Sequence, residues 1–184
     1  MKKFFVFVAI CIGIVVVATE YQSAEAIPRQ ELTHAPPQTT SGWEQSVVET
    51  IPKVLEKYGD IIKEAGREYR INPKLIAGIL IVESMGDPRA ESSAGAKGCM
   101  QTLPSTDIVI GVKGNSFDCV VSIWKGTKYL AHLRDTYKFT PGYKTIAAYV
   151  DGPGRVSSYT NEDLLKHDYL NKVAFVVEHL PKNF

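Results

Sequence analysis

The chain has no excess of charge of either sign, because 21 lysines and arginines stand against 20 aspartates and glutamates, for a net charge of +1. Such a chain has no electrostatic reason to bind nucleic acid, and we expect no nucleic-acid partner. Its three cysteines and four histidines form no cluster with metal-ligand spacing. Phosphate-binding loops and the serine motifs of hydrolases are also missing. The sequence therefore predicts no metal and no other cofactor, and the domain histidines are expected at the surface or at helix ends: His132, His167 and His179.

Signals for β-structure are scarce as well. The chain contains no strong hairpin signal and no internal repeat. Its hydrophobic content of 45% is enough for a real core, and the apolar residues recur mostly at helical spacing. The sequence therefore predicts a mainly α domain, with at most a short β ribbon within residues 90–115.

The N-terminal residues 1–26 are predicted to be a secretory signal peptide. Two lysines precede an apolar run over residues 4–18, and Ala24-Glu25-Ala26 offers a cleavage site between small residues. The alternative is an uncleaved membrane anchor, although the run is short for a full span. We expect export to the periplasm, the envelope or the outside. Residues 27–46, rich in Pro and Thr, are then a flexible linker to one domain over residues 47–184.

Export also affects how the cysteines are interpreted. After cleavage the chain retains Cys99 and Cys119. An oxidising compartment favours a disulfide between them, which would close a loop of about 20 residues. The alternative is a pair of free, buried thiols.

Capping residues, prolines and glycines divide the domain into helices. Asn72 followed by Pro73 is typical of a helix start, and Gly86 with Asp87-Pro88 ends that helix just after Glu83. Asp60 and Asp118 are further expected caps. The predicted helices cover residues 47–58, 61–69, 73–83, 104–110, 119–137, 143–149 and 168–179.

Glu83 is the candidate catalytic residue. It follows Ile79-Leu80-Ile81-Val82 at the end of a helix that must be mostly buried. A carboxylic acid in a partly apolar cleft has a raised pKa and can carry a proton near neutral pH. A helix C-terminus also disfavours the charged form. Such a group can protonate the leaving oxygen of a glycosidic bond, whereas the alternative is an exposed Glu at a helix end.

Many glycosidases need a second carboxylate as base or nucleophile. The candidates are Asp87, Asp107 and Asp151. Each of them also suits a local structural role, so the sequence offers no clear partner for Glu83.

Three segments in a fixed order resemble the SLT, or goose-lysozyme-like, family of lytic transglycosylases over roughly residues 55–180. The first is Glu83-Ser84, the second is Gly95-Ala96-Lys97-Gly98-Cys99-Met100-Gln101, and the third is Ala148-Tyr149-Val150-Asp151-Gly152-Pro153. The resemblance implies a mainly helical, lysozyme-like fold. It also implies an exported enzyme, expected as a monomer, whose partner is the glycan strand of peptidoglycan.

In the family that this chain resembles, one Glu serves as both acid and base. It cleaves the bond between N-acetylmuramic acid and N-acetylglucosamine, and the muramic 6-hydroxyl then closes a 1,6-anhydro ring. The alternatives are a lysozyme-type hydrolase on the same substrate, or a non-catalytic glycan-binding scaffold. Small exported enzymes of this kind often serve secretion, conjugation or sporulation machinery.

The resemblance also assigns substrate-binding residues. Ser84 would help to fix the acid and the sugar, and Ser92 corresponds to a loop serine of the family. Gly98 belongs to a small-residue turn that lets the backbone approach a sugar. Met100 would line the cleft, and Gln101 would hydrogen-bond the N-acetyl or hydroxyl groups.

Two tyrosines complete the expected site. Tyr149 could orient Glu83 through its hydroxyl, and Tyr169 corresponds to a late family tyrosine that reaches the cleft. The chain departs from the family at Val150, where the family has Asn, so one side-chain hydrogen bond is missing. Cys99 stands where the family has Leu.

Overall fold

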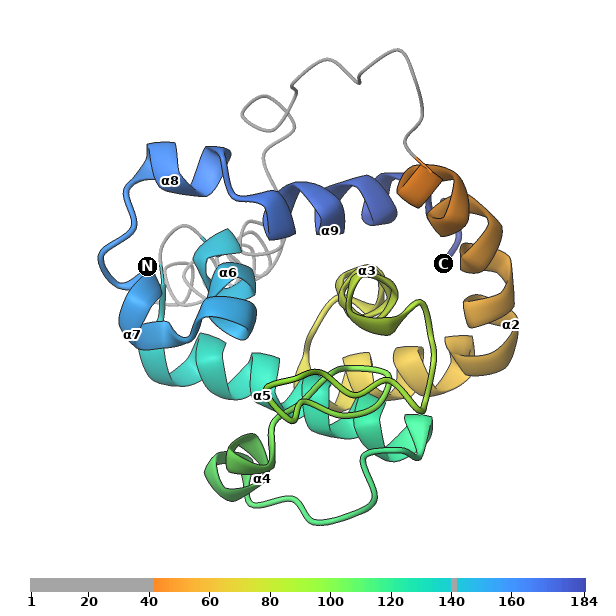
Figure 1. The fold of residues 1–184 in the computed structure, drawn as a ribbon, viewed down its shortest axis with the longest axis horizontal. Helices are drawn as coiled ribbons and strands as arrows, with labels where there is room; N and C mark the ends of the chain where they lie inside the picture. The colour runs from red at the N-terminus through yellow and green to blue at the C-terminus, as the bar shows by residue number, and fades with distance from the viewer. Residues whose placement is uncertain (1–41, 140–141) are drawn as a thin grey trace, which may run out of the picture.

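The computed structural model describes residues 42–139 and 142–184. It is mainly helical, and Figure 1 shows α3 at the centre with the other long helices around it. No strand forms among the described residues, where β pairing is limited to two isolated bridges that involve Lys97. The predicted mainly α class is thus confirmed. The helices are α2 (Gly42–Tyr69), α3 (Pro73–Ser84), α4 (Pro104–Ile110), α5 (Cys119–Tyr137), α6 (Tyr143–Asp151), α7 (Pro153–Val156), α8 (Asn161–Leu165) and α9 (Asp168–His179).

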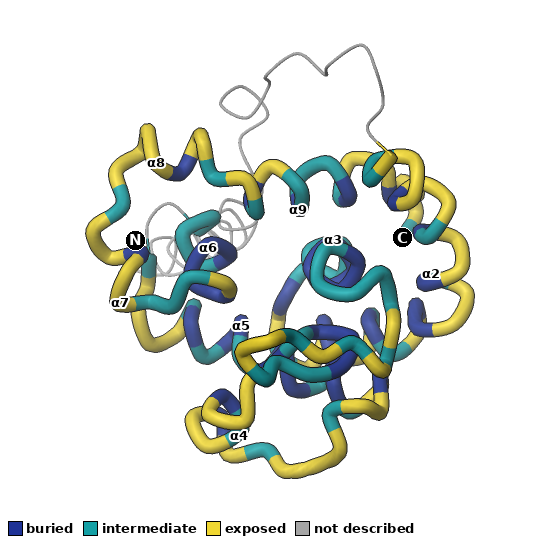
Figure 2. Tube along the Cα trace, viewed as in Figure 1, coloured by how far each residue is buried: buried dark blue, intermediate teal, exposed yellow. Residues whose placement is uncertain are grey.

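Helix α3 forms the core of the domain. Its start follows the predicted signals, because the Asn72 side chain accepts a hydrogen bond from Lys74 N at 2.9 Å and Pro73 occupies the first turn. Helices α2, α5 and α9 pack around α3, and Figure 2 shows α3 as largely buried. A helix that is apolar nearly all round is buried on several sides. Five side chains of α3 are fully buried: Ile76, Ala77, Ile79, Leu80 and Ile81.

A glycine brings α9 close to α3. A Cβ added to Gly78 would lie 3.0 Å from Val177 Cγ2, so a larger residue at this position would require the facing side chains of α9 to shift. This close contact matters for the site, because α3 carries Glu83 and α9 carries Tyr169.

Helix α2 corrects one prediction. Residues 47–58 and 61–69 were expected as separate helices, with Asp60 as a cap, but they form one helix that passes through Pro52 and begins at Gly42. Residues 42–46 of the predicted linker are therefore helical. A proline inside a helix costs about 3 kcal/mol, but a buried stripe along the whole length of α2 offsets that cost: Val47, Ile51, Val54, Tyr58, Ile62 and Ala65.

The other long helices follow the predictions more closely. Helices α4, α5 and α9 have the expected bounds, and α3 ends one residue beyond the predicted Glu83. Asp118 caps α5 by accepting from Val120 N at 2.9 Å. Helix α6 extends to Asp151, beyond the predicted end. The short helices α7 and α8 were not predicted, although Thr160 and Asp163 form a capping box that the sequence displays as Thr-x-x-Asp.

The signal-peptide prediction for residues 1–26 and the linker prediction for residues 27–41 lie outside the described part of the chain. Within the described part, no helix combines the length and the hydropathy needed to cross a bilayer.

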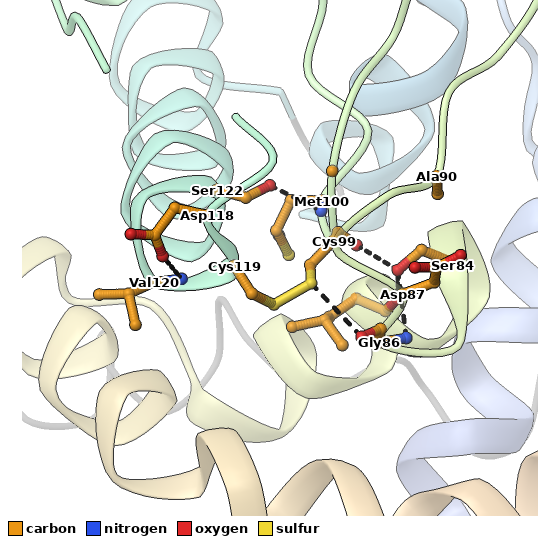
Figure 3. Close-up of a disulfide and its surroundings, with 12 residues drawn as sticks. Ser84, Gly86, Asp87, Ala90, Cys99, Met100, Asp118, Cys119, Val120 and Ser122 are labelled. Carbon is orange, nitrogen blue, oxygen red and sulfur yellow. Dashed lines mark hydrogen bonds between the residues drawn. A yellow bond between two sulfur atoms is a disulfide. The ribbon is translucent and has the colours of Figure 1, made fainter. Parts of the chain in front are cut away.

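A disulfide joins Cys99 to Cys119, as the export argument predicted. It ties the loop after α3 to the first residue of α5, and Figure 3 shows it beside Ser84 and Gly86. Both cysteines are buried, with exposed fractions of 0% and 5%. The bond therefore anchors the loop that runs past the end of α3.

Removing this disulfide should destabilise the protein. The bridge closes a segment with a sequence separation of 20, and restricting the unfolded chain in this way is worth roughly 3 kcal/mol. For a domain of this size that corresponds to a fall of about 10 °C in Tm. Thermal unfolding with and without reductant measures it. The Cys99→Ala/Cys119→Ala variant is the control and should melt at the same temperature with and without reductant. An unchanged wild-type Tm under reductant would refute the prediction.

Candidate active site

Glu83 lies in the last turn of α3. The helix stops immediately afterwards, because Met85 adopts a left-handed conformation with φ of 54° and its N–H bonds to Ile81 O at 2.9 Å. Gly86 continues the turn at φ of 81°, and a Cβ there would lie 2.8 Å from Val54 Cγ2 of α2. The chain thus turns sharply against α2 and leaves Glu83, half-buried, at the end of the central helix.

The environment of Glu83 favours its neutral form. Burial raises the pKa of the Glu83 carboxyl from 4.5 to about 7, even though a hydrogen bond from Tyr169 opposes the shift. The Tyr169 hydroxyl donates to Glu83 Oε1 at 2.6 Å. Burial and then the Glu83 charge raise the pKa of Tyr169 well above its ordinary value, so this hydroxyl remains a donor. Glu83 can therefore both release and accept a proton near neutral pH.

The raised pKa makes a prediction about stability. The folded-state pKa of Glu83 lies above the unfolded value of 4.5, so the folded protein holds this proton more tightly. The resulting stabilisation is fully present below about pH 4.5 and is lost as the pH rises through 7. Relative to Glu83→Gln, the wild-type free energy of unfolding should fall by about 3 kcal/mol between pH 4.5 and pH 8.

Urea unfolding of both proteins at the two pH values measures this difference. Glu64→Gln is the matched control, because Glu64 is an exposed carboxylate on α2. A constant difference between wild type and Glu83→Gln across this pH range would contradict the burial argument.

Ser84 fixes the loop that follows α3. Its hydroxyl donates to Cys99 O at 2.8 Å and accepts from Gly86 N at 3.1 Å, as Figure 3 shows. Ser84 thus holds the end of α3 to the loop that contains Cys99, and its expected role of fixing the acid and the sugar remains a prediction.

Ser92 and Gly98 shape the same loop. The Ser92 hydroxyl accepts from Ala96 N at 3.0 Å and closes a tight turn. Gly98 has φ of 74°, and a Cβ placed on it would lie 1.7 Å from Ser116 O. Glycine at 98 is therefore required by the close approach of another part of the chain.

Met100 and Tyr149 are placed differently from the expectation. Met100 is fully buried, so its side chain lies beneath the surface and does not line an open cleft. The Tyr149 hydroxyl donates to Met100 O at 2.7 Å. The hydrogen bond to Glu83 comes from Tyr169, and the idea that the Tyr149 hydroxyl makes this bond was wrong. Glu83 still lies close enough for its charge to add to burial in raising the pKa of Tyr149.

Two residues of α5 support this arrangement and were missed in the sequence. The Ser122 hydroxyl accepts from Met100 N at 2.9 Å. A Cβ on Gly126 would lie 2.7 Å from both Met100 Cβ and the Tyr149 hydroxyl, so glycine makes room for both side chains. An isolated glycine inside an otherwise helical pattern was the available signal.

Gln101 also turns inward. Its side-chain amide donates to Ala90 O at 2.9 Å and to Gly98 O at 3.0 Å. Both amide N–H groups are thus used within the loop, so the expected hydrogen bond to substrate remains a prediction for the Oε1 acceptor alone. The residue has φ of 47°, a conformation that is uncommon for a non-glycine residue.

The three candidate second carboxylates each have a local partner, as the sequence suggested. Asp87 accepts from Arg89 N at 2.8 Å. Asp107 pairs with the fully buried ammonium of Lys125 at 2.6 Å. Asp151 accepts from Tyr159 and His167. Within residues 42–139 and 142–184, no group of three or more His, Cys, Asp or Glu is arranged to hold a metal ion.

A hollow of about 540 Å³ adjoins Tyr169. It lies between the end of α6 and the start of α9, and Val150, 48% exposed, lines it where the family has Asn. His167 also lines the hollow. As expected for a helix end, it occupies the N-cap position of α9, but its side chain is only 13% exposed and makes no capping hydrogen bond. No residue pattern in the chain indicated that His167 would pair with Asp151.

The domain is mainly helical, and its buried central helix ends in one half-buried acid. This arrangement places the protein in the class of lysozyme-like proteins. Residues 60–170 match the transglycosylase SLT domain family. The chain therefore belongs to this family.

Individual relatives are transglycosylases as well, in agreement with the family match. The chain is 36% identical over 81 residues to a transglycosylase of Enterobacteria phage PRD1, which covers 44% of this chain and 30% of the relative. It is 33% identical over 118 residues to membrane-bound lytic murein transglycosylase E of Buchnera aphidicola, covering 56% of this chain and 53% of the relative. The chain thus spans about half or less of the length of these curated relatives.

The fold is also found in solved structures. The soluble lytic transglycosylase SLT70 of Escherichia coli matches with a TM-score of 0.59 and 23% identity, over 74% of this chain and 27% of that chain. Lytic transglycosylase Slt of Pseudomonas aeruginosa, in an inactive mutant form, matches with a TM-score of 0.56 and 22% identity, over 66% of this chain and 23% of that chain. These matches establish the lysozyme-like fold.

Proposed function

We propose that this protein is an exported lytic transglycosylase of peptidoglycan. It cleaves the β-1,4 bond between N-acetylmuramic acid and N-acetylglucosamine and leaves a 1,6-anhydro end. The observation that carries the proposal is Glu83, a half-buried carboxyl with its pKa raised to about 7 and with a tyrosine hydroxyl 2.6 Å from Oε1. Membership of the SLT family supports the substrate and the reaction.

The proposed reaction uses one carboxyl twice. Protonated Glu83 donates its proton to the glycosidic oxygen as the bond from C1 to that oxygen breaks. The N-acetyl carbonyl of the muramic sugar stabilises the positive charge at C1, which replaces the second carboxylate of other glycosidases. The Glu83 carboxylate then takes the proton of the 6-hydroxyl, whose oxygen bonds to C1. The proton that Glu83 lost is thereby restored, and no water is consumed.

The surroundings of Glu83 suit both steps. A pKa of about 7 leaves the acid and base forms close in free energy at neutral pH. The Tyr169 hydroxyl stabilises the carboxylate that forms when the proton leaves. The other candidate carboxylates, Asp87, Asp107 and Asp151, are bonded to local partners. A mechanism with one carboxyl is therefore favoured over one with two.

Mass spectrometry of products from purified sacculi tests the reaction. The proposal predicts 1,6-anhydromuramic ends from wild type and none from Glu83→Gln. Reducing muramic ends would instead identify a lysozyme-type hydrolase. A wild-type protein that binds glycan strands and releases no fragments would be a scaffold.

The place of action is part of the same proposal. The apolar run with a cleavage site in residues 1–26 supports export, and relatives are named membrane-bound murein transglycosylases. We propose action in the periplasm or envelope, on glycan strands, as a monomer and in the service of a larger envelope machine. Fractionation of cells that express the full chain tests the location. Retention in the cytoplasm would contradict export, and deletion of residues 1–26 is the control.

A further inference from the structure

Asp151 is the centre of a small polar cluster beside the candidate site. Its Oδ2 accepts a hydrogen bond from the Tyr159 hydroxyl at 2.5 Å and lies 2.8 Å from His167 Nε2. Arg155 lies farther away, with its nitrogen 3.9 Å from Oδ1. The Asp151 and His167 side chains are only 19% and 13% exposed. The contact between Asp151 and His167 is therefore a partly buried link between two separate segments of the chain.

The two segments carry two tyrosines that interact with Glu83, Tyr169 through a hydrogen bond and Tyr149 through the charge of the acid. Asp151 is the last residue of α6, two positions after Tyr149, whose hydroxyl binds Met100 O at 2.7 Å. His167 immediately precedes α9, two positions before Tyr169, whose hydroxyl binds Glu83 at 2.6 Å. The contact between Asp151 and His167 thus joins the end of α6 to the start of α9 close to Glu83.

The start of α9 has no conventional cap. His167 occupies the N-cap position but makes no capping hydrogen bond with its side chain. A helix usually gains stability from such a bond. Here the side chain is directed to Asp151 instead, so the first turn of α9, which contains Tyr169, is held by a contact with α6.

The protonation of the cluster is consistent with a fixed link. His167 Nδ1 is buried without a hydrogen-bond partner among the described residues, so the hydrogen-bond network assigns the imidazole proton to Nε2, facing Asp151. Burial raises the pKa of Asp151, but the hydrogen bonds from Tyr159 and His167 outweigh it and lower the pKa overall. Asp151 therefore acts as a charged acceptor for both donors, and such hydrogen bonds are stronger than neutral ones.

We propose that Asp151 and His167 are positioning residues that hold the Tyr169 hydroxyl against Glu83. Neither is assigned a contact with the reacting atoms. The inference rests on the proposed role of Glu83 and goes beyond it, because it identifies what sets the geometry of the acid.

The proposal has a signature that a purely structural role would lack. A hydroxyl that donates to a carboxylate stabilises the charged form and lowers its pKa. If the start of α9 shifts and Tyr169 moves away, the pKa of Glu83 must rise above about 7. Because the first step needs protonated Glu83, the basic limb of the pH profile of kcat/KM should move to higher pH.

The experiment records pH profiles of sacculus cleavage for wild type, Tyr169→Phe, His167→Ala and the double variant. We expect His167→Ala to move the basic limb upward, in the same direction as Tyr169→Phe, and to lower kcat about 10-fold. In the Tyr169→Phe background, His167→Ala should add no further shift, because both changes remove the same hydrogen bond. An unmoved limb in His167→Ala, or equal shifts in both backgrounds, would overturn the proposal.

Conservative variants separate positioning from folding. His167→Gln retains an N–H that can reach Asp151 and should restore most of the wild-type profile. Asp151→Asn retains the size of the side chain but loses its charge and should shift the limb part of the way. If His167→Ala fails to fold, an Asp151→Asn profile identical to wild type would itself refute the proposal. The controls are His179→Gln at the far end of α9 and Asp135→Asn in the last turn of α5, both exposed.

A second readout does not depend on activity. Carbon NMR of the Glu83 carboxyl in each folded variant reports its titration directly, and His167→Ala should raise the midpoint. If wild type fails to cleave sacculi, the proposed function fails, while the NMR titrations still decide the positioning role. If wild type cleaves and Glu83→Gln does not, an unmoved midpoint in His167→Ala refutes the positioning role alone.

Discussion

Replacing Glu83 with Gln is expected to slow cleavage of glycan strands by roughly 10²–10⁴-fold, the usual contribution of a general acid or base. Gln has nearly the same shape, and its side-chain oxygen can still accept the hydrogen bond that Tyr169 now gives to Oε1. It cannot deliver a proton to the glycosidic oxygen or accept one from the 6-hydroxyl. The fold should therefore persist while both proton transfers are lost.

The measurement is the release of soluble fragments from purified sacculi at pH 7, with circular dichroism to confirm the fold. Asp87→Asn is the matched control, because Asp87 is the nearest downstream carboxylate in the sequence and Asn can still accept from Arg89 N. The control should remain within about 3-fold of wild type, well below the effect of losing a general acid. A Glu83→Gln protein that cleaves at a near-wild-type rate would remove Glu83 from the mechanism.

Gly98→Ala is expected to cost at least about 4 kcal/mol of folding free energy, which is an exceptional loss for one methyl group. A Cβ at position 98 would lie 1.7 Å from the backbone oxygen of Ser116. The obstacle is backbone, so no side-chain rotation relieves it. The φ of 74° adds a further cost for any residue with a Cβ. The loop between α3 and α4, including Met100 and Gln101, must shift for the protein to fold at all.

Gly95→Ala separates the two causes. Gly95 lies in the same loop with a φ of 82°, but a Cβ there would meet nothing within 4 Å. This variant should lose only about 1 kcal/mol, the cost of the backbone conformation alone. Urea unfolding of both variants gives the difference. Equal losses at positions 95 and 98 would show that the contact with Ser116 contributes nothing.

Much of the helical frame could be predicted because its signals are local. Asn72-Pro73 at the start of α3 and Asp118 at the start of α5 act within a few residues of themselves. The position of Glu83 at the end of an apolar helix is likewise visible in the sequence, and so is the fact that burial would raise its pKa. The order of the family motifs predicted the family that residues 60–170 match.

The parts that could not be predicted depend on contacts between distant segments. Pro52 indicates a helix boundary locally, but the long buried stripe of α2 against α3 overrides it. Tyr149 was the expected partner of Glu83, and Tyr169 was expected only to reach the cleft. The packing of α6 and α9 decides that the hydrogen bond to Glu83 comes from Tyr169. The pairing of Asp151 with His167 has no sequence signal, because it depends on how the chain returns through α7 and α8.

The most direct test of the central claim is a pH titration of the Glu83 carboxyl by carbon NMR. The signal is assigned by its loss in Glu83→Gln. The account predicts a midpoint of about 7, because burial at the end of α3 outweighs the hydrogen bond from Tyr169. A midpoint near the ordinary glutamate value of 4.5 would mean that the carboxyl is charged at neutral pH, and it would contradict the assignment of Glu83 as the proton donor.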